Sequence, residues 1–412
     1  MSTAAHAAAE AAARRSYGKL VAFLAARTRD VAAAEDALSE AFAAALADWP
    51  AHGAPRNPEA WLLTVARRRM VDGVRQRVQG EALAAQLQTL SCMVQLGPDA
   101  DDIPDRRLAL LFACAHPAIE PGVHAPLMLQ TVLGFDAAAI ASAFLVAPSA
   151  MGQRLVRAKA KIRQAGIRLQ MPLRSDMPPR LDAVLEAIYA AYAEGWADPA
   201  GADARLRNLA DEALWLARLV ASLLPEEPEA LGLLAMMLHA HARRDARRDA
   251  QGGYVPLDRQ DTACWDTALI AEAEALLQRA AALGSVGRFQ LEAAVQSAHA
   301  ARLRSGRTDW CAIERLYRGL CELTGSPVAA LNHAVALSHA RGPAAGLQAL
   351  DGLCADARLA EHQPYWAARA ELLAACGQQE AACAAYGRAI GLERDPVVRE
   401  FLQRRMQMPP PH

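Results

Sequence analysis

The chain has 412 residues, with 44 Lys and Arg against 45 Asp and Glu, so its net charge is close to zero. That balance excludes a protein coated with nucleic acid, and any such contact has to come from local basic segments. Hydrophobic residues make up 53% of the sequence and aromatic residues only 5%, and much of the hydrophobic share is alanine. Because alanine is the best helix former, the composition predicts an all-α protein of about two to four domains.

Several classes of protein are disfavoured. Neither the N-terminus, Met1–Ala13, nor any later stretch has the apolar run of a signal peptide or membrane span, so we expect a cytoplasmic protein with no membrane partner. The eight scattered cysteines indicate small buried side chains in a reducing compartment. His239 and His241 point to different faces of a helix and make a weak metal pattern. No catalytic motif stands out, so we expect a binding protein without a cofactor.

Proline and glycine residues punctuate the chain and define its organisation. We predict a helical domain at 14–80, a linker at 81–104, a second helical domain at 105–171, a helical extension at 172–270 and helical repeats at 271–408.

The first domain contains two notable helices. One, at Asp30–Leu46, carries Glu35, Asp36 and Glu40 on an apolar background with Phe42. It is an ordinary amphipathic helix unless a protein partner with a basic groove binds it.

The second notable helix starts at Asn57-Pro58, since asparagine caps free N–H groups and proline is tolerated at the first helical position. From Trp61 to Val78 it has five Arg against one Asp. An aromatic residue beside guanidinium groups suits single-stranded or melted nucleic acid. A core tryptophan with a solvated basic face explains the segment equally well.

The second domain ends in a predicted helix-turn-helix. Asp136 caps a short helix at 137–144, and Pro148 starts another whose buried stripe is Met151, Leu155, Ala158 and Ile162. From Ser149 to Arg168 there are six Lys and Arg and no acid. This layout favours reading of duplex DNA over a plain surface hairpin. We expect Pro126 to interrupt the preceding helix.

The C-terminal half has a weaker pattern. Gly377, Ala382, Tyr386 and Ala389 keep the spacing of the second half of a TPR repeat, so we predict TPR-like helices. The loop Arg243–Gln260 is dense in Arg and Asp, which favours ion pairs and caps that pin it to the helices over contact with one of the two preceding domains or with a regulator.

These segments together resemble the sigma-70 family of RNA polymerase sigma factors, in its extracytoplasmic-function (ECF) type. The stretch from Asp30 to Phe42 looks like region 2.2, Pro58 to Arg75 looks like regions 2.3 and 2.4, and the basic helix ending Gln153–Lys159 looks like region 4. Ser39 departs from the glutamine that the family often has there. The stretch Ala242–Gly252 with Leu257–Asp261 and Trp265 resembles a subgroup with a long TPR-like extension.

The resemblance implies partners and roles. Core RNA polymerase would be bound through its clamp helices and flap, promoter DNA at the −10 and −35 elements, and a further protein partner by the extension. The implied polymerase-binding residues are Glu35, Asp36, Ser39, Glu40 and Phe42. The implied −10 residues are Trp49, Asn57, Trp61, Arg67, Arg68, Arg69, Asp72, Arg75 and Arg77. The implied −35 residues are Ser149, Gln153, Arg154, Arg157, Lys159 and Lys161.

Two other hypotheses remain open. A conventional dimeric helix-turn-helix regulator with a TPR-like sensor would bind a palindromic duplex without polymerase. A TPR-type scaffold would have no salt-sensitive affinity for DNA at all.

Overall fold

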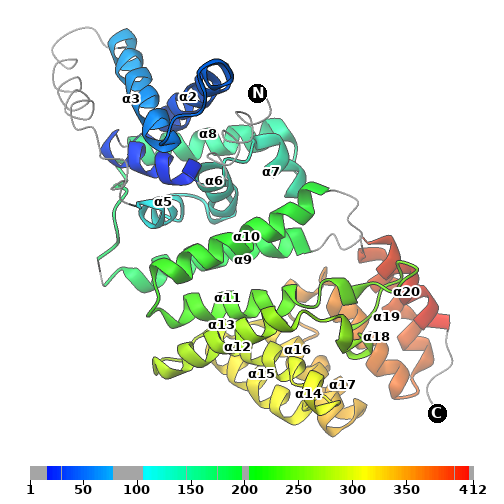
Figure 1. Ribbon diagram of the computed structural model, residues 1–412. Helices are drawn as coiled ribbons and strands as arrows, with labels where there is room; N and C mark the ends of the chain where they lie inside the picture. The colour runs from blue at the N-terminus through cyan, green and yellow to red at the C-terminus, as the bar shows by residue number, and fades with distance from the viewer. Residues whose placement is uncertain are drawn as a thin grey trace. The chain divides into compact units, whose positions relative to one another are not determined.

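The computed structural model describes residues 16–28, 30–77, 105–144, 146–173, 175–196, 204–393 and 395–407 (Figure 1). Apart from helices and turns, these residues contain one isolated β-bridge, between Arg248 and Tyr254. The predicted all-α class is therefore confirmed. The chain divides into two compact units, residues 1–195 with 208–213 and residues 196–207 with 214–412.

Unit 1 starts with a helix at residues 16–28. It continues with α2 (Val31–His52), α3 (Pro58–Arg77), α5 (Arg107–Cys114), α6 (Pro121–Leu133), α7 (Ala137–Ala143), α8 (Pro148–Gln164) and α9 (Met177–Trp196). The predicted caps at Asn57 and Asp136 are present, since both side chains accept hydrogen bonds from backbone N–H groups three residues on, at 3.0 and 2.7 Å. Asp30, which was not predicted as a cap, accepts the same kind of bond from Ala33 at 3.0 Å. Each cap satisfies a donor that the first turn of a helix leaves free.

The expectation for Pro126 is wrong, because α6 runs through it without a break. Proline removes the hydrogen bond to the carbonyl four residues earlier, which belongs to Gly122 in the first turn. Most residues of α6 are buried, including Leu127, Met128 and Leu129. Their burial outweighs one lost hydrogen bond. The predicted linker at 81–104 lies outside the described residues.

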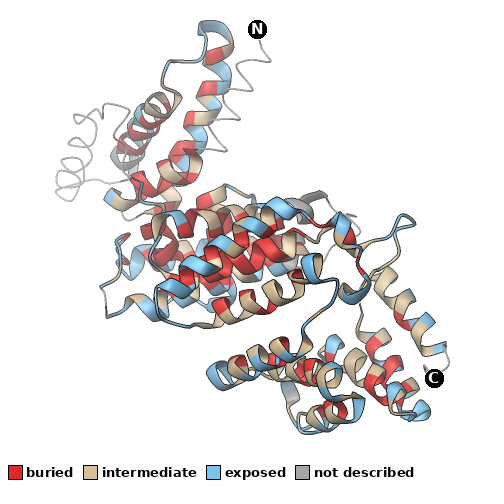
Figure 2. Ribbon diagram, turned by 60° about the horizontal axis from the view of Figure 1, so that its bottom comes forward, coloured by how far each residue is buried: buried red, intermediate tan, exposed pale blue. Residues whose placement is uncertain are grey.

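Unit 2 is a succession of packed helices that includes α10 (Ala204–Leu223) except for its residues 208–213. The others are α11 (Pro228–His241), α12 (Thr267–Ala282), α13 (Arg288–Ala300), α14 (Arg302–Ser305), α15 (Trp310–Thr324), α16 (Pro327–Arg341), α17 (Pro343–Asp351), α18 (Gln363–Ala375), α19 (Gln379–Leu392) and α20 (Pro396–Gln407). Neighbours in sequence pack together, as α11 does with α12, α15 with α16 and α18 with α19. Figure 2 shows buried residues recurring along these helices between exposed ones.

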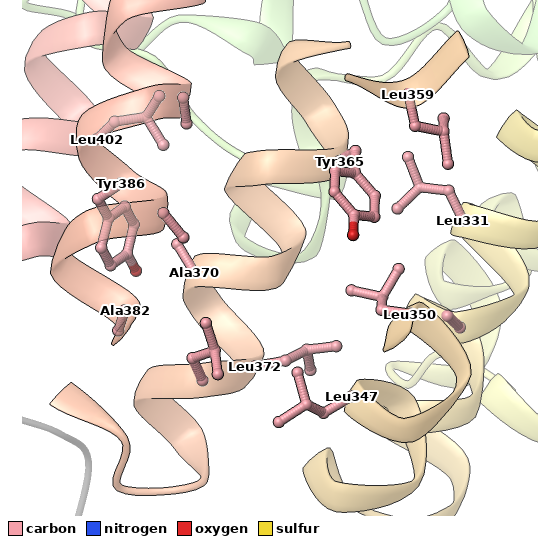
Figure 3. Packing of buried hydrophobic residues seen from close by; sticks show 14 residues of the cluster. Leu331, Leu347, Leu350, Leu359, Tyr365, Ala370, Leu372, Ala382, Tyr386 and Leu402 are labelled. Atoms are coloured by element: carbon pink, nitrogen blue, oxygen red, sulfur yellow. The ribbon is translucent and has the colours of Figure 1, made fainter. Parts of the chain in front are cut away.

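One core of unit 2 lies on both sides of α18 (Figure 3). Leu331, Leu350 and Tyr365 meet on the side of α16 and α17, and Tyr386 and Leu402 lie on the side of α19 and α20. Ala382 and Ala389 are fully buried and Tyr386 is 2% exposed. Their burial agrees with the predicted spacing, in which small residues let two helices approach and the aromatic ring fills the groove.

The polar loop Arg243–Gln260 is pinned as predicted. Arg243 donates to the side chain of Gln296 at 2.5 Å, Arg247 lies over the Trp196 ring, and Arg248 pairs with Asp395 at 2.5 Å. Arg302 donates to the backbone carbonyls of Asp258 and Gln260, both at 2.7 Å. The arginines therefore satisfy groups that an irregular loop would otherwise leave unpaired.

The cysteines follow the prediction only in part. Cys114 is buried, whereas Cys264, Cys311 and Cys354 are exposed, and all of the described cysteines are free thiols. The burial of a cysteine depends on whether its position in the helix or turn faces the core or the solvent, whatever the hydrophobicity of its side chain. Among the described helices, not one combines the length and apolar character that crossing a lipid bilayer requires.

Candidate functional site

Helix α8 presents two distinct sides. Met151, Leu155, Ala158 and Ile162 are buried, as the periodicity predicts. Of the six predicted −35 residues, Ser149, Gln153, Arg154, Arg157 and Lys161 are exposed. Helix α7 packs against α8 across a short connection. The exposed side is therefore a basic surface without an acidic residue.

Lys159 has a different environment from the other five. It pairs with Glu35 of α2, and the two side chains are 12% and 9% exposed. One turn further on, Arg163 of α8 pairs with Asp30 at 3.3 Å, at the start of α2. A predicted DNA-binding residue and a predicted polymerase-binding residue, 124 positions apart in the sequence, thus neutralise each other's charge.

The surroundings of this pair have low polarity. Burial raises the pKa of the Glu35 carboxyl, and the Lys159 ammonium acts in the opposite direction. The second carboxylate oxygen, Oε1, has no hydrogen-bond partner among the described residues. Burial also raises the pKa of the neighbouring Cys114 thiol to about 12. The pair therefore lies in the interior of unit 1.

The remaining predicted polymerase-binding residues lie at the surface of α2. Asp36, Ser39 and Glu40 are exposed, and Phe42 is half-buried with its ring stacked 6.5 Å from that of Tyr17. Glu40 pairs with Arg69 of α3 at 3.3 Å, and both side chains are more than half exposed. Such an exposed pair contributes little to stability and exchanges easily for another partner.

The predicted −10 residues divide between surface and interior. Arg68, Arg69 and Asp72 of α3 are exposed, whereas Arg67 is buried with its guanidinium 5.3 Å from the centre of the Phe23 ring. Burial lowers the pKa of Arg67. The side chains of Arg75 and Arg77 lie outside the described residues.

The two tryptophans of this region touch each other. Trp49 is 1% exposed and meets the half-buried Trp61 edge to face, with 5.5 Å between ring centroids. The indole N–H of Trp49 has no partner among the described residues. Asn57 serves as the cap of α3, with its side-chain oxygen bound to the N–H of Ala60. Trp61 and Asn57 are thus half-buried members of this set, beside the exposed Arg68, Arg69 and Asp72.

The sequence reasoning missed Gly18, in the helix at 16–28. A Cβ at this position would lie 2.3 Å from the backbone oxygen of Val132 in α6. Glycine inside a helix is unfavourable, which was the available signal for a close backbone approach. The first and second predicted domains are therefore in direct contact within unit 1.

Unit 2 holds a cavity of about 730 Å³ between the polar loop and helices α16, α18 and α20. Its lining is largely apolar, with Val398, Phe401 and Leu402 on α20. Polar groups enter at Glu371 and Arg405, whose side chains are paired, and Tyr386 donates to Glu371 at 2.7 Å. A cavity of this size and polarity is of the kind that holds small ligands or peptide side chains.

Histidine and acidic residues do not form a metal site in the described part of the chain. His239 is 2% exposed and 3.6 Å from Glu274. Burial, together with nearby Arg243, lowers the pKa of His239 to about 4. His239 is thus a neutral core histidine at neutral pH.

Comparison with known proteins divides the chain in two. Residues 13–79 match the model of sigma-70 region 2, and residues 180–281 match a family of unknown function, DUF6596. An uncharacterized protein of Rhizobium meliloti (strain 1021), R00370, is 38% identical over 373 residues, which cover 88% of this chain and 87% of that protein. No solved structure matches.

The region 2 match includes α2 and α3, on which the exposed acidic and basic residues described above lie. Sigma-70 region 2 is a domain of sigma factors, a non-enzymatic family, and it indicates a role in transcription initiation. The chain belongs to the family of the rhizobial protein, with a sigma-70 region 2 domain at its N-terminus followed by a DUF6596 domain.

Proposed function

We propose that the chain is a cytoplasmic sigma factor of the ECF type. It binds core RNA polymerase, recognises −10 and −35 promoter elements and starts transcription of a specific set of genes. The observation that carries the proposal is the acid-free basic side of α8, in a chain whose N-terminus matches sigma-70 region 2. Polymerase supplies the phosphodiester chemistry.

Recognition of the −35 element is assigned to α8. Arginine and glutamine side chains can make paired hydrogen bonds to base edges in the major groove, and the charges of arginine and lysine also neutralise flanking phosphates. Gln153, Arg154 and Arg157 are exposed on one side of the helix, with Ser149 one turn earlier. This side would enter the groove, and the buried stripe would hold the helix on α7 and α6.

Melting of the −10 element is assigned to α3. Unpairing DNA costs a few kcal/mol, and capture of an unstacked base can offset that cost. Trp61 provides an aromatic surface, and Arg68 and Arg69 provide the positive charge that attracts phosphates. Asp36, Ser39 and Glu40 of α2 would contact the clamp helices of polymerase.

The extension is assigned a regulatory role. Its helices enclose a cavity suited to a ligand or a protein side chain, and its polar loop is tied into the same unit. It would act on the sigma module within the same chain or dock a signalling partner. Deleting residues 172–412 should then change the regulation of promoter-specific transcription.

In vitro transcription tests the proposal. Core polymerase is assayed with and without the protein on a library of candidate promoters. Transcripts from one new pair of promoter motifs, lost on Arg154→Ala with Arg157→Ala, are expected. If initiation does not increase but the protein alone shifts a palindromic duplex, a conventional helix-turn-helix regulator is the better assignment.

A further inference from the structure

We propose that the contact between α2 and α8 is an autoinhibitory contact, in which the −35 helix covers part of the polymerase-binding helix until the two separate. The α2–α8 contact comprises the pairs Glu35–Lys159 and Asp30–Arg163. This inference rests on the proposed function, because it assigns a resting state to the same two surfaces.

The first argument is steric and electrostatic. Glu35 is 7% exposed, so a second protein cannot reach its carboxylate while Lys159 is in place. Lys159 is equally unable to reach a DNA phosphate, because its ammonium group is used by Glu35. Each binding surface thus withholds a charge from the ligand of the other, and the closed state excludes full engagement of either partner.

The second argument is that the closed state is shaped for this contact. Gly18 brings the helix at 16–28 against the backbone of Val132, where any side chain would collide with the carbonyl oxygen. Gly134, at the end of α6, has φ +76° and lies against the ring of Tyr17. At both positions any other residue would clash or strain the backbone, so the two glycines indicate specific packing of the first domain on the second.

The third argument concerns why the contact is ionic. A buried ion pair is often no more stabilising than two apolar side chains of similar volume, because both charges lose their hydration. Here Oε1 of Glu35 also lacks a partner among the described residues. Charges at this place are therefore a poor choice for a permanent core, but they suit surfaces that separate and then bind charged partners.

The test measures affinity for core polymerase, without DNA, using the full chain. In the closed state, Lys159→Met leaves the Glu35 carboxylate buried without its cation. In the open state, the same substitution leaves the polymerase-binding helix α2 unchanged, so the open state is favoured. Because apparent affinity scales with the fraction of competent molecules, we expect binding to tighten by about tenfold or more if fewer than about one in ten molecules is open. Arg168→Met, an exposed residue of the same unit, is the matched control and should change nothing.

A gain of affinity separates the proposal from simple damage, which would weaken binding. If the wild type binds polymerase and Lys159→Met binds no more tightly, the autoinhibitory contact is refuted and the proposed function stands. If the wild type does not bind polymerase at all, the proposed function fails, and with it the inhibitory role.

A distance measurement tests the closed state without polymerase. Spin labels on unnatural amino acids at the exposed positions Ala43 of α2 and Gln164 of α8 report the separation of the two helices in the full chain. The wild type should give one narrow distribution, and Lys159→Met and Gly18→Ala should each add a longer, broader one. A distribution that neither substitution alters would overturn the proposal.

Discussion

Replacing Arg154 and Arg157 with alanine should reduce the salt dependence of promoter binding by the polymerase complex. Both residues are exposed on α8, and within the described part of the chain their side chains make one hydrogen bond, a long one of 3.4 Å from Arg157 to the carbonyl of Gln153. The free energy of unfolding should therefore change by less than about 0.5 kcal/mol. Any change in binding then reports on the DNA interface.

The expected size follows from counterion release. Each phosphate neutralised contributes about 0.9 to the slope of log affinity against log salt, so two arginines account for about 1.8. Raising salt fourfold, from about 50 to about 200 mM, changes log salt by about 0.6. Over that range the wild type should lose about tenfold more affinity than the double variant.

The assay is fluorescence anisotropy with a labelled promoter duplex and polymerase carrying each variant. Polymerase makes its own phosphate contacts in both complexes, so the difference in slope isolates α8. Arg307→Ala, at an exposed position in unit 2, is the control and should leave the slope unchanged. Equal slopes for the wild type and the double variant would show that this side of α8 does not face DNA.

Three further outcomes concern stability and are measured by chemical or thermal unfolding. Leu155→Ala removes a 1% exposed side chain and should cost about 2–5 kcal/mol, whereas its 67% exposed neighbour Val156→Ala should cost less than about 0.5; equal costs would mean that α8 is rotated. Tyr386→Phe removes the hydrogen bond to Glu371 and should lower the free energy of unfolding by about 1.5–3 kcal/mol, and no loss would contradict the bond. The depressed pKa of His239, about 4, favours protonation of the unfolded chain, so stability is complete above about pH 6.5 and falls as pH drops towards 4. His239→Leu should flatten that fall, and an unchanged pH profile would rule out this histidine as its cause.

Local rules recovered the helices because the signals are local. Asp30, Asn57 and Asp136 cap the helices that they were expected to start, and the stripe from Met151 to Ile162 is buried. Each inference needed residues only a few positions apart, because the geometry of a single helix determines which of its side chains lie on the same face.

The environment of individual charges could not be predicted in the same way. Lys159 and Arg67 look like their exposed neighbours in sequence, yet one pairs with Glu35 and the other lies over Phe23. The burial and the partner of each side chain depend on which distant segment packs against its turn of the helix, and sequence periodicity does not contain that information. The prediction that Pro126 interrupts its helix failed for a related reason, since burial of α6 outweighs the local cost of one lost backbone hydrogen bond.

The ion pair between Arg248 and Asp395 has a consequence for how the chain is made. The two residues are 147 positions apart in the sequence. Because synthesis adds about 5–20 residues per second, α20 is made on the order of ten seconds after the loop. Until then Asp395 is not available to pair with Arg248, and the edge of the cavity formed by Phe401 and Arg405 does not exist. A chain released before α20 would carry a finished unit 1 and an unfinished unit 2, so this late contact marks the molecules in which both units are complete.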